Sequence, residues 1–486
     1  MTDVPANTPL EFDEIDGGPL VAAAKKVYPR RVEGFYRQVK WAVLAMTLAI
    51  YYLTPFARWD RGPYEPHQAV LVDLEHRRFF FFWIELWPQE VYYFTGLLII
   101  AALALFLINA LAGRVWCGYL CPQTVWTDLF FMVERFVEGD RRERMLKDAG
   151  PRNARWWREK IAKHALWLVI AWWTGGAWVL YFADAPHLVW SLLTFQAPFI
   201  AYASIGVLTL TTYFFAGFMR EQVCLYMCPW PRIQAALTDE HALNVTYHYD
   251  RGEPRLSLKK ALAAQAKGEK VGDCIDCNYC VEVCPTGVDI RGGPNLGCIQ
   301  CGLCIDACDS VMEKIGRPTR LIAYNTDINI KRHAEGLAPV YRLIRPRTAL
   351  YSAVIAVVGF VMLYSLTSRP NAAVTLVHDR NPLYVRTADG SIRNGYTVHV
   401  ANKAARTRRF WLEVNGLDDL KVEVVGAGKS GAPSFEVGPD QTRELRVLVT
   451  STQAPKAEET ALTFSLVGSD NVVAGETKDF FRSGGN

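Results

Sequence analysis

The chain has 486 residues, of which 51% are hydrophobic and 15 are Trp, a high content for a soluble protein. Its 53 Lys and Arg residues against 49 Asp and Glu residues give a net charge of only +4, which argues against a nucleic-acid-binding protein. At about 100–200 residues per domain, the length suggests two to four domains.

The first 38 residues are polar and contain several acidic side chains, so they predict a cytoplasmic segment rather than a cleavable signal peptide. Beyond them, five apolar stretches are long enough to cross a bilayer, which takes about 20 residues. Five such stretches favour a multi-span membrane protein over a soluble protein with buried core helices. The predicted spans are residues 39–57, 91–112, 163–183, 197–219 and 348–367.

Lys and Arg are unevenly distributed around these spans. They are frequent before the first span, between the second and third, and before the fifth, whereas residues 184–196 contain none. Because basic loops tend to stay cytoplasmic, the N-terminus is predicted inside and the C-terminus outside. The first outer loop fits less well, because it contains Arg58, Arg61, Arg77 and Arg78. All twelve cysteines then lie on the cytoplasmic side, where disulfides seldom persist, so metal ligands or redox thiols are expected.

Four cysteines lie in two C-x3-C-P motifs, Cys117 and Cys121 after the second span and Cys224 and Cys228 after the fourth. Each proline disfavours a helical conformation at the preceding residue and favours the start of a new helix. Cys121 and Cys228 are therefore predicted at helix N-termini, where peptide dipoles favour a thiolate. Four such thiols at one membrane face suit a soft metal ion such as Cu(I), or reversible dithiol chemistry. The alternative is that they are small packing residues beside the membrane.

Two further groups of polar residues are weaker candidates for a site. Four histidines could ligate haem or copper, although the first two lie near span ends and suit a membrane interface. The charged residues of 134–160 are interpreted as a solvated helix face rather than a binding site. The four histidines are His164, His187, His241 and His248.

The remaining eight cysteines lie within residues 274–308, in two runs with C-x2-C-x2-C-x3-C spacing. In two-cluster ferredoxins the first three cysteines of a run hold one iron–sulfur cluster and the fourth ligates the other. Zinc normally takes two pairs of ligands, so it fits a run of four poorly. One [4Fe–4S] cluster is therefore assigned to Cys274, Cys277, Cys280 and Cys308, and the second to Cys284, Cys298, Cys301 and Cys304.

Beyond the fifth span, apolar and aromatic residues alternate with polar ones. About seven short strands are expected, which predicts an all-β sandwich of immunoglobulin-like type. This region has no Cys pair of a true immunoglobulin domain, and a binding or docking module outside the membrane is the inference. The clearest strands are 396–400, 408–414, 421–425, 443–449 and 461–467.

The predicted fold class is a multi-domain membrane protein. It combines a five-helix transmembrane region, an inserted bacterial-type two-[4Fe–4S] ferredoxin domain and a C-terminal all-β immunoglobulin-like sandwich. The predicted parts are the cytoplasmic segment 1–38, the four-span region with both C-x3-C-P motifs 39–250, the cytoplasmic ferredoxin domain 251–330, the linker and fifth helix 331–370, and the periplasmic sandwich 371–486.

Four stretches of this sequence resemble one known family. They are ELWPQEVYYFTGLL (85–98), AGRVWCGYLCPQTVWTDLFFMVERFVEGDR (112–141), YDRGEPR (249–255) and CPTGVDIR (284–291). They are similar to the FixG/CcoG family, also called RdxA, of bacterial accessory proteins for assembly of the cbb-type haem–copper oxidase. The resemblance covers nearly the entire chain. It implies a cytoplasmic-membrane protein with five spans and two [4Fe–4S] clusters.

The resemblance also implies a function, because the family is associated with reducing Cu(II) to Cu(I) during oxidase maturation. By position, the catalytic and copper-binding role passes to Cys117, Cys121, Cys224 and Cys228. A cytoplasmic flavodoxin or ferredoxin is the expected electron donor. Oxidase assembly factors or copper chaperones and membrane lipid are the expected partners, with no nucleic acid. A homo-oligomer is left open.

Two other functions are considered. Membrane polyferredoxins of nitrate and nitrous-oxide respiration share similar motifs and pass electrons between quinol and periplasmic partners. The absence of a haem-binding C-x-x-C-H motif and of a strong bis-histidine pattern within the spans weakens this quinol relay. The other alternative is a non-enzymatic sensor or scaffold, in which the β domain organises oxidase assembly.

Overall fold

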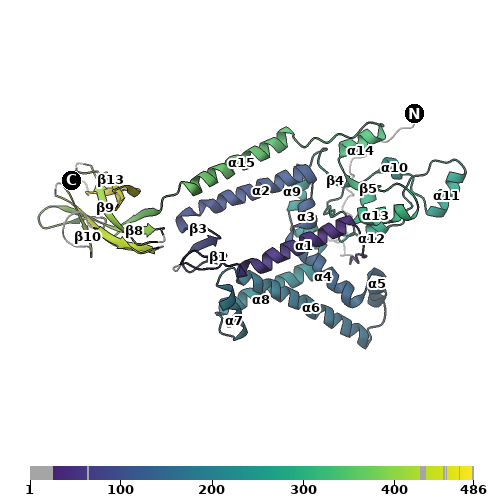
Figure 1. The fold of residues 1–486 in the computed structure, drawn as a ribbon, viewed down its shortest axis with the longest axis horizontal. Helices are drawn as coiled ribbons and strands as arrows, with labels where there is room; N and C mark the ends of the chain where they lie inside the picture. The colour runs from purple at the N-terminus through teal and green to yellow at the C-terminus, as the bar shows by residue number, and fades with distance from the viewer. Residues whose placement is uncertain are drawn as a thin grey trace, which may run out of the picture. The chain divides into compact units, whose positions relative to one another are not determined.

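A computed structural model of the chain describes residues 26–62, 65–404, 406–426, 434–439, 441–452, 455, 457–469 and 471–483. The described residues form two compact units, and several long helices contribute one end to each (Figure 1). The first unit comprises the described residues of Met1–Leu48, Leu105–Gly175 and Gly206–Thr348, and the second those of Ala49–Ala104, Gly176–Ile205 and Ala349–Asn486.

Four helical segments of the described chain are long and apolar enough to cross a membrane, and they coincide with the first, second, fourth and fifth predicted spans. The third predicted span, 163–183, lies mostly on the continuous helix α6 (Ala154–Val179), which does not reach the same hydropathy. Its apolar half is rich in Trp, whose indole N–H makes the side chain only partly apolar. The number of five spans therefore stays a prediction. The four segments are Phe35–Phe56 with α1 (Phe35–Leu53), Tyr92–Ala112 (α2), Phe199–Met219 with α8 (Phe199–Phe214), and Pro346–Thr367 (α15).

In the first unit, short helices and loops surround a two-stranded antiparallel sheet. Strand β4 (Asn244–Tyr247) pairs with β5 (Ile322–Asn325), which closes the loop-rich segment that holds eight cysteines. The remaining helices of this unit are α3 (Val115–Tyr119), α4 (Pro122–Glu138), α5 (Arg141–Ala149), α9 (Trp230–Leu237), α10 (Tyr249–Gly252), α11 (Leu258–Ala266), α12 (Tyr279–Glu282), α13 (Leu303–Lys314) and α14 (Asp327–Ala334), with π-helical turns η3 (Phe215–Met219) and η4 (Val223–Met227) and the 3-10 turn η5 (Ile290–Gly292).

The cysteine-rich segment is tied to the start of the first apolar helix. The buried carboxylate of Asp306 on α13 accepts hydrogen bonds from the backbone N–H groups of Tyr36 and Arg37, at 3.1 and 2.7 Å. These are among the N–H groups of α1 that have no partner inside the helix. Asp306 therefore caps α1 from a distant part of the sequence and places the cysteine loops at that end of the helix.

The C-terminal part of the second unit is a sandwich of two antiparallel sheets. One sheet has the order β10-β12-β8-β6 with β7 beside β8, and the other has the order β11-β9-β13-β14. Inward-facing residues such as Tyr396, Val398 and Phe464 are fully buried between them, which is the alternation predicted from the sequence. The strands are β6 (Ala372–His378), β7 (Val385–Arg386), β8 (Ile392–Asn402), β9 (Arg408–Asn415), β10 (Leu420–Val424), β11 (Ser434–Val437), β12 (Gln441–Ser451), β13 (Glu459–Gly468) and β14 (Val473–Arg482).

The five clearest predicted strands are confirmed by β8, β9, β10, β12 and β13, with β10 ending at Val424, one residue before the predicted end at 425. The second unit also contains elements that the sequence pattern did not indicate. A small sheet precedes α2, and α7 (Ala185–Leu193) follows α6. The small sheet consists of β1 (Val70–Asp73), β2 (Arg78–Phe81) and β3 (Ile84–Leu86).

Candidate functional site

The first set of four cysteines predicted to share a cluster lines a single cavity in the first unit. Its empty volume is about 350 Å³, and the other lining residues are mostly apolar. Cys277 is exposed, whereas Cys274 and Cys280 are buried, so the cavity reaches the protein surface at Cys277. The four are Cys274, Cys277, Cys280 and Cys308.

The second predicted set, Cys284, Cys298, Cys301 and Cys304, lines a neighbouring cavity of about 360 Å³. None of these four side chains is exposed. Cys280 lines both cavities, so the two lie side by side.

The chemistry of both cavities fits an iron–sulfur cluster, since each offers the four soft thiols of its predicted set in a mainly apolar lining. Burial raises the pKa of Cys280, Cys298 and Cys308 to about 12, so at neutral pH these thiols keep their protons until a metal replaces them. Within the described ranges, no three Cys, His, Asp or Glu side chains converge as a site for a single metal ion.

Arg291 places a positive charge beside the first cavity. Its guanidinium group donates to Asp276 at 2.6 Å, to Asp289 at 2.7 Å and to Asn278 at 2.5 Å. The hydrogen bond to Asp289 is the main reason that the pKa of Arg291 is raised, so the group stays charged. A cluster in this cavity is easier to reduce when that charge is present.

Replacing Arg291 with Gln is expected to lower the reduction potential of the exposed cluster. The change removes one positive charge and leaves two carboxylates without their partner, which favours the more oxidised state by an expected shift of tens of millivolts, on the order of 1 kcal/mol. A redox titration followed by electron paramagnetic resonance measures the shift. Lys314→Gln, on the exposed end of α13, is the matched control. Equal potentials in both variants would show that Arg291 has only a structural role.

The two C-x3-C-P motifs come together in the first unit. Cys117 and Cys224 each lie near enough to Cys121 and Cys228 that the charge of one thiolate raises the pKa of another. Cys121 is the N-cap of α4, as predicted. Cys228 directly precedes Pro229, the N-cap of α9, so the second predicted helix start is also confirmed.

Burial raises the pKa of Cys117 and of Cys224 to about 12. The Sγ of Cys117 also donates a hydrogen bond to the Oε1 of the buried Gln234, at 3.4 Å. The two thiols that do not precede a helix therefore stay protonated at neutral pH in the metal-free protein.

The first C-x3-C-P motif packs directly on the loop of the second cavity. A Cβ atom on Gly118 would lie 2.7 Å from the carbonyl oxygen of Ile299 and 3.0 Å from the Cα of Cys301. The hydroxyl of Tyr119 donates to the carbonyl of Cys301 at 2.9 Å. The residue after Cys117 thus touches the backbone that carries a thiol of the second cavity.

The second motif lies against the same loop. Cys224 shares a small pocket with Pro285, Thr286 and Ile299. The buried Arg114 joins both motifs to the loop, because its guanidinium group donates to the carbonyls of Leu296 at 2.6 Å and Pro231 at 2.8 Å. The group of four thiols therefore adjoins the second cavity, which in turn adjoins the first.

Replacing Gly118 with Ala is expected to destabilise the first unit by about 1–3 kcal/mol, because the added methyl group overlaps the Ile299–Cys301 backbone. Thermal unfolding of the detergent-solubilised protein measures the effect. Gly206→Ala is the matched control, since Gly206 lies in α8 with no atom within 4 Å of the added carbon. Equal melting temperatures would contradict the close packing of α3 on the loop.

A buried ion-pair network holds the second motif in place. Glu134 on α4 is 2% exposed and accepts hydrogen bonds from Arg220 at 2.5 Å and from Arg144 at 2.7 Å. Gln123, two residues after Cys121, donates to the carbonyl of Arg220 at 3.2 Å. Arg220 has a positive φ of 44° and lies four residues before Cys224, so its contacts with α4 hold the chain just before the second motif.

The interpretation of residues 134–160 as a solvated helix face is wrong for three of its charged residues. Glu134, Glu138 and Arg144 are each only 2% exposed. Glu134 and Glu138 are four residues apart, so they share one face of α4, and their ion-pair partners lie on α5 and α6. Because opposite charges lie on three elements that pack together, they pair with one another rather than with water.

The sequence reading missed Arg114, Gln123 and Arg220 as residues that position the thiols. The available signal was their place beside the two motifs, where a buried cation or amide has to satisfy loop carbonyls.

Of the predicted histidines, His164 packs on Trp167 and Phe218, and its Nδ1 lies 3.0 Å from the Tyr213 hydroxyl. His187 is exposed, whereas His248 contacts Asn325 at 3.3 Å. His241 lies in the loop after α9 with its Nδ1 buried.

Three segments match known domain families. Residues 219–327 match the family described as "4Fe-4S dicluster domain", and residues 94–138 match a "4Fe-4S binding domain". Residues 362–483 match the "IG-like fold at C-terminal of FixG". The immunoglobulin-like sandwich and the two-cluster iron–sulfur domain predicted from the sequence are thus confirmed, whereas the 4Fe-4S match over residues 94–138 was not predicted.

Relatives are similar over almost the whole chain. "Nitrogen fixation protein FixG" of Rhizobium meliloti is 48% identical over 481 residues, covering 93% of this chain and 91% of its own. "Protein RdxB" and "Protein RdxA" of Cereibacter sphaeroides are 48% and 47% identical, covering 91% and 92% of this chain and 93% of their own lengths. A solved structure of a FixG-related protein from Vibrio parahaemolyticus is 21% identical, covers 24% of this chain and 99% of its own, and has a TM-score of 0.21.

Proposed function

Because this chain belongs to the FixG and RdxA family, with iron–sulfur domains and apolar helices of membrane-spanning length, we propose that it is a membrane electron-transfer protein that reduces Cu(II) to Cu(I). The proposal extends to a role in maturing a cbb-type cytochrome c oxidase. It places the ferredoxin domain in the cytoplasm and the sandwich in the periplasm of a bacterial inner membrane.

The eight cysteines of the two cavities are proposed as the cluster ligands. The exposed cavity takes Cys274, Cys277, Cys280 and Cys308, and the inner one takes Cys284, Cys298, Cys301 and Cys304. When bound, the clusters supply electrons one at a time, which matches the single electron that Cu(II) needs. The protein side chains bury the inner site, exclude water from it and place a positive charge beside the outer one.

One observation carries the proposal, namely that the four C-x3-C-P thiols adjoin the inner cavity through the contact of Gly118 with Cys301. Four thiols are soft donors that stabilise Cu(I) over Cu(II), so they favour the reduced product. The exposed edge at Cys277 suits a cytoplasmic donor such as a flavodoxin or ferredoxin. Electrons thus enter at the outer cavity and leave at the thiols. Oxidase assembly factors or copper chaperones would then accept the Cu(I).

The test uses the full-length protein, purified anaerobically and reduced. Cu(II) is added, and the change in cluster absorbance is followed together with Cu(I), which is trapped by a Cu(I)-specific chelator. About two Cu(I) ions per protein are expected, one for each electron held by two clusters. The same reduced protein with buffer alone is the control for slow autoxidation.

The other functions give different results in this experiment. Clusters that stay reduced with Cu(II) but are oxidised by a ubiquinone or menaquinone analogue would replace the proposal with a quinone relay. Clusters that respond to neither acceptor would favour a sensor or scaffold for assembly.

A further inference from the structure

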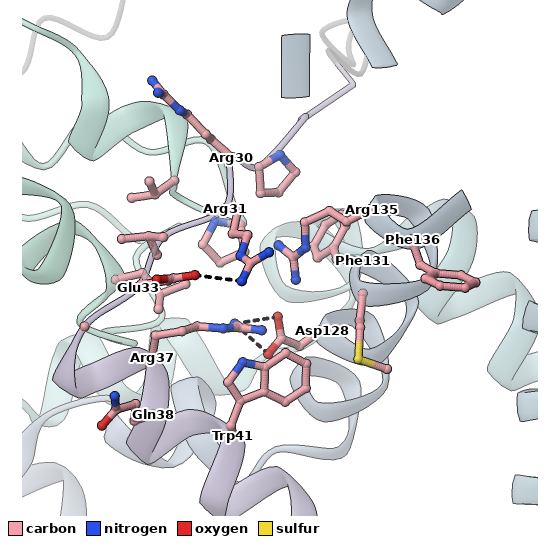
Figure 2. A pocket seen from close by; sticks show the side chains of 17 residues that line it. Arg30, Arg31, Glu33, Arg37, Gln38, Trp41, Asp128, Phe131, Arg135 and Phe136 are labelled. Carbon is pink, nitrogen blue, oxygen red and sulfur yellow. Dashed lines mark hydrogen bonds and ion pairs between the residues drawn. The ribbon is translucent and has the colours of Figure 1, made fainter. Parts of the chain in front are cut away.

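A second pocket in the first unit lies between the segment before α1, helix α4 and the loop that carries Cys284. Its volume is about 500 Å³ and it is open to solvent. Arg31, Arg37 and Arg135 direct their guanidinium groups toward the same space, whereas Arg30 points away (Figure 2). Three cations that face one cavity indicate a site for an anion.

The carboxylates near the pocket are fewer than its cations. Asp140, whose charge also acts on Arg135, accepts a hydrogen bond from the backbone N–H of Arg31 at 3.0 Å. Asp128 is the acceptor for Arg37, at 2.9 and 3.0 Å, and it also lies 3.8 Å from Lys40. The single charge of this buried carboxylate therefore offsets two cations, and Arg135 is a third cation in the same pocket. Arg31 pairs with Glu33 at 2.6 Å, but both side chains are mostly exposed, so this pair can open at little cost.

Two guanidinium groups have hydrogen-bonding capacity left over. Arg37 is 7% exposed, and its Nη2 has no hydrogen-bond partner among the described residues. Arg135 makes no ion pair and no side-chain hydrogen bond with any residue that the structure describes. Burial and the charge of Arg37 lower the pKa of Arg135 to about 10, so it is still charged at neutral pH. A buried donor without a partner is costly, and an anion in the pocket would satisfy it.

The rim of the pocket is apolar and lies at the end of a helix of membrane-spanning length. Trp41 lies in the first turns of α1, and Met132 and Phe136 on α4 are 39% and 84% exposed. Aromatic and basic side chains together are typical of the boundary between lipid head groups and acyl chains. Planar guanidinium groups bind phosphate oxygens in pairs, which suits a phosphate better than a single carboxylate.

We propose that this pocket binds a phosphate group, and that in the membrane it is the phosphate of an anionic phospholipid. The apolar rim then contacts the glycerol and the first methylene groups of the lipid. Val283, Pro285 and Leu303 also line the pocket, so the bound phosphate lies beside the loop of Cys284. The lipid thereby fastens the cysteine loops to the membrane surface.

The test uses the full-length protein in nanodiscs made from phosphatidylglycerol and phosphatidylcholine. After detergent extraction, the lipids that remain with the protein are quantified by mass spectrometry. Phosphatidylglycerol is expected to be enriched on the wild type, and Arg135→Gln is expected to reduce the enrichment about fivefold, the effect of one cation at a membrane surface. Arg142→Gln, an exposed arginine of α5 outside the pocket, is the matched control.

A second arm separates lipid from soluble phosphate. If inorganic phosphate raises the melting temperature of the wild type but not of Arg135→Gln, and no lipid is enriched, the phosphate chemistry holds and its source is soluble. If neither probe distinguishes Arg135→Gln from Arg142→Gln, the proposal is overturned. The exposed Arg31→Gln provides a second pocket variant that is not expected to disturb folding, and cluster absorbance reports the integrity of each protein.

Discussion

Replacing Cys117, Cys121, Cys224 and Cys228 with Ala should abolish the reduction of Cu(II) by the cluster-loaded protein while leaving about eight iron atoms per chain. The four thiols adjoin the inner cavity but do not line it, so their loss should remove the proposed copper ligands and leave the proposed cluster ligands in place. The measurements are Cu(I) formation after anaerobic reduction, together with the iron content and absorbance of the variant.

The iron content of the wild type distinguishes a copper site at the four thiols from a third iron–sulfur cluster. Residues 94–138 match a 4Fe-4S binding family yet contain only Cys117 and Cys121, half of the usual ligands. About twelve iron atoms per wild-type chain, falling to eight in the variant, would mean that the four thiols hold a third cluster rather than copper. Rapid Cu(I) formation by the variant would place the reduction elsewhere. Two double variants, one for each motif, serve as matched comparisons.

Replacing Glu134 with Gln should destabilise the protein by about 3–5 kcal/mol, because it leaves buried cations without their counter-charge. Glu134 accepts from Arg220 and Arg144, and the ammonium group of Lys163 lies 3.9 Å away. Glutamine keeps the shape of the side chain, so the change isolates the charge. The expected results are a lower melting temperature in detergent and weaker copper binding, since Arg220 positions the second motif.

Glu143→Gln is the control for this change, since Glu143 is an exposed carboxylate on the neighbouring helix α5. Its melting temperature should stay close to that of the wild type. If Glu134→Gln and Glu143→Gln unfold at the same temperature, the network of Glu134 does not carry the stability assigned to it. Normal stability with lost copper binding would instead limit its role to the second motif.

The grouping of the eight cluster cysteines followed from the sequence because it depends on short-range spacing. A loop with C-x2-C-x2-C spacing can surround only one corner of a cubane, so the fourth ligand has to come from the other run. The two cavities contain the same two sets. The strands of the sandwich were also predictable, since alternating polarity is a local property of each strand.

The third predicted span shows that an apolar stretch of sufficient length does not by itself establish a membrane-spanning helix. The helix is present as α6, but Trp residues and the charges at its start keep its hydropathy below that of the other four segments. The edge strands β6, β7, β11 and β14 were not predicted either. Their patterns are short or weakly alternating, and they are held by pairing with β8, β9 and β13.

The sequence by itself therefore determined the two sets of cysteines that line the two cavities, the helix starts after each C-x3-C-P motif and the sandwich, all of which depend on residues close together in the chain. Only the tertiary structure decided that the four remaining thiols adjoin the inner cavity, that Glu134 binds Arg220, and that arginines from two distant segments face one pocket. These contacts join residues about 90 to 180 positions apart. No local pattern encodes them, because they arise only when separate helices and loops pack against one another.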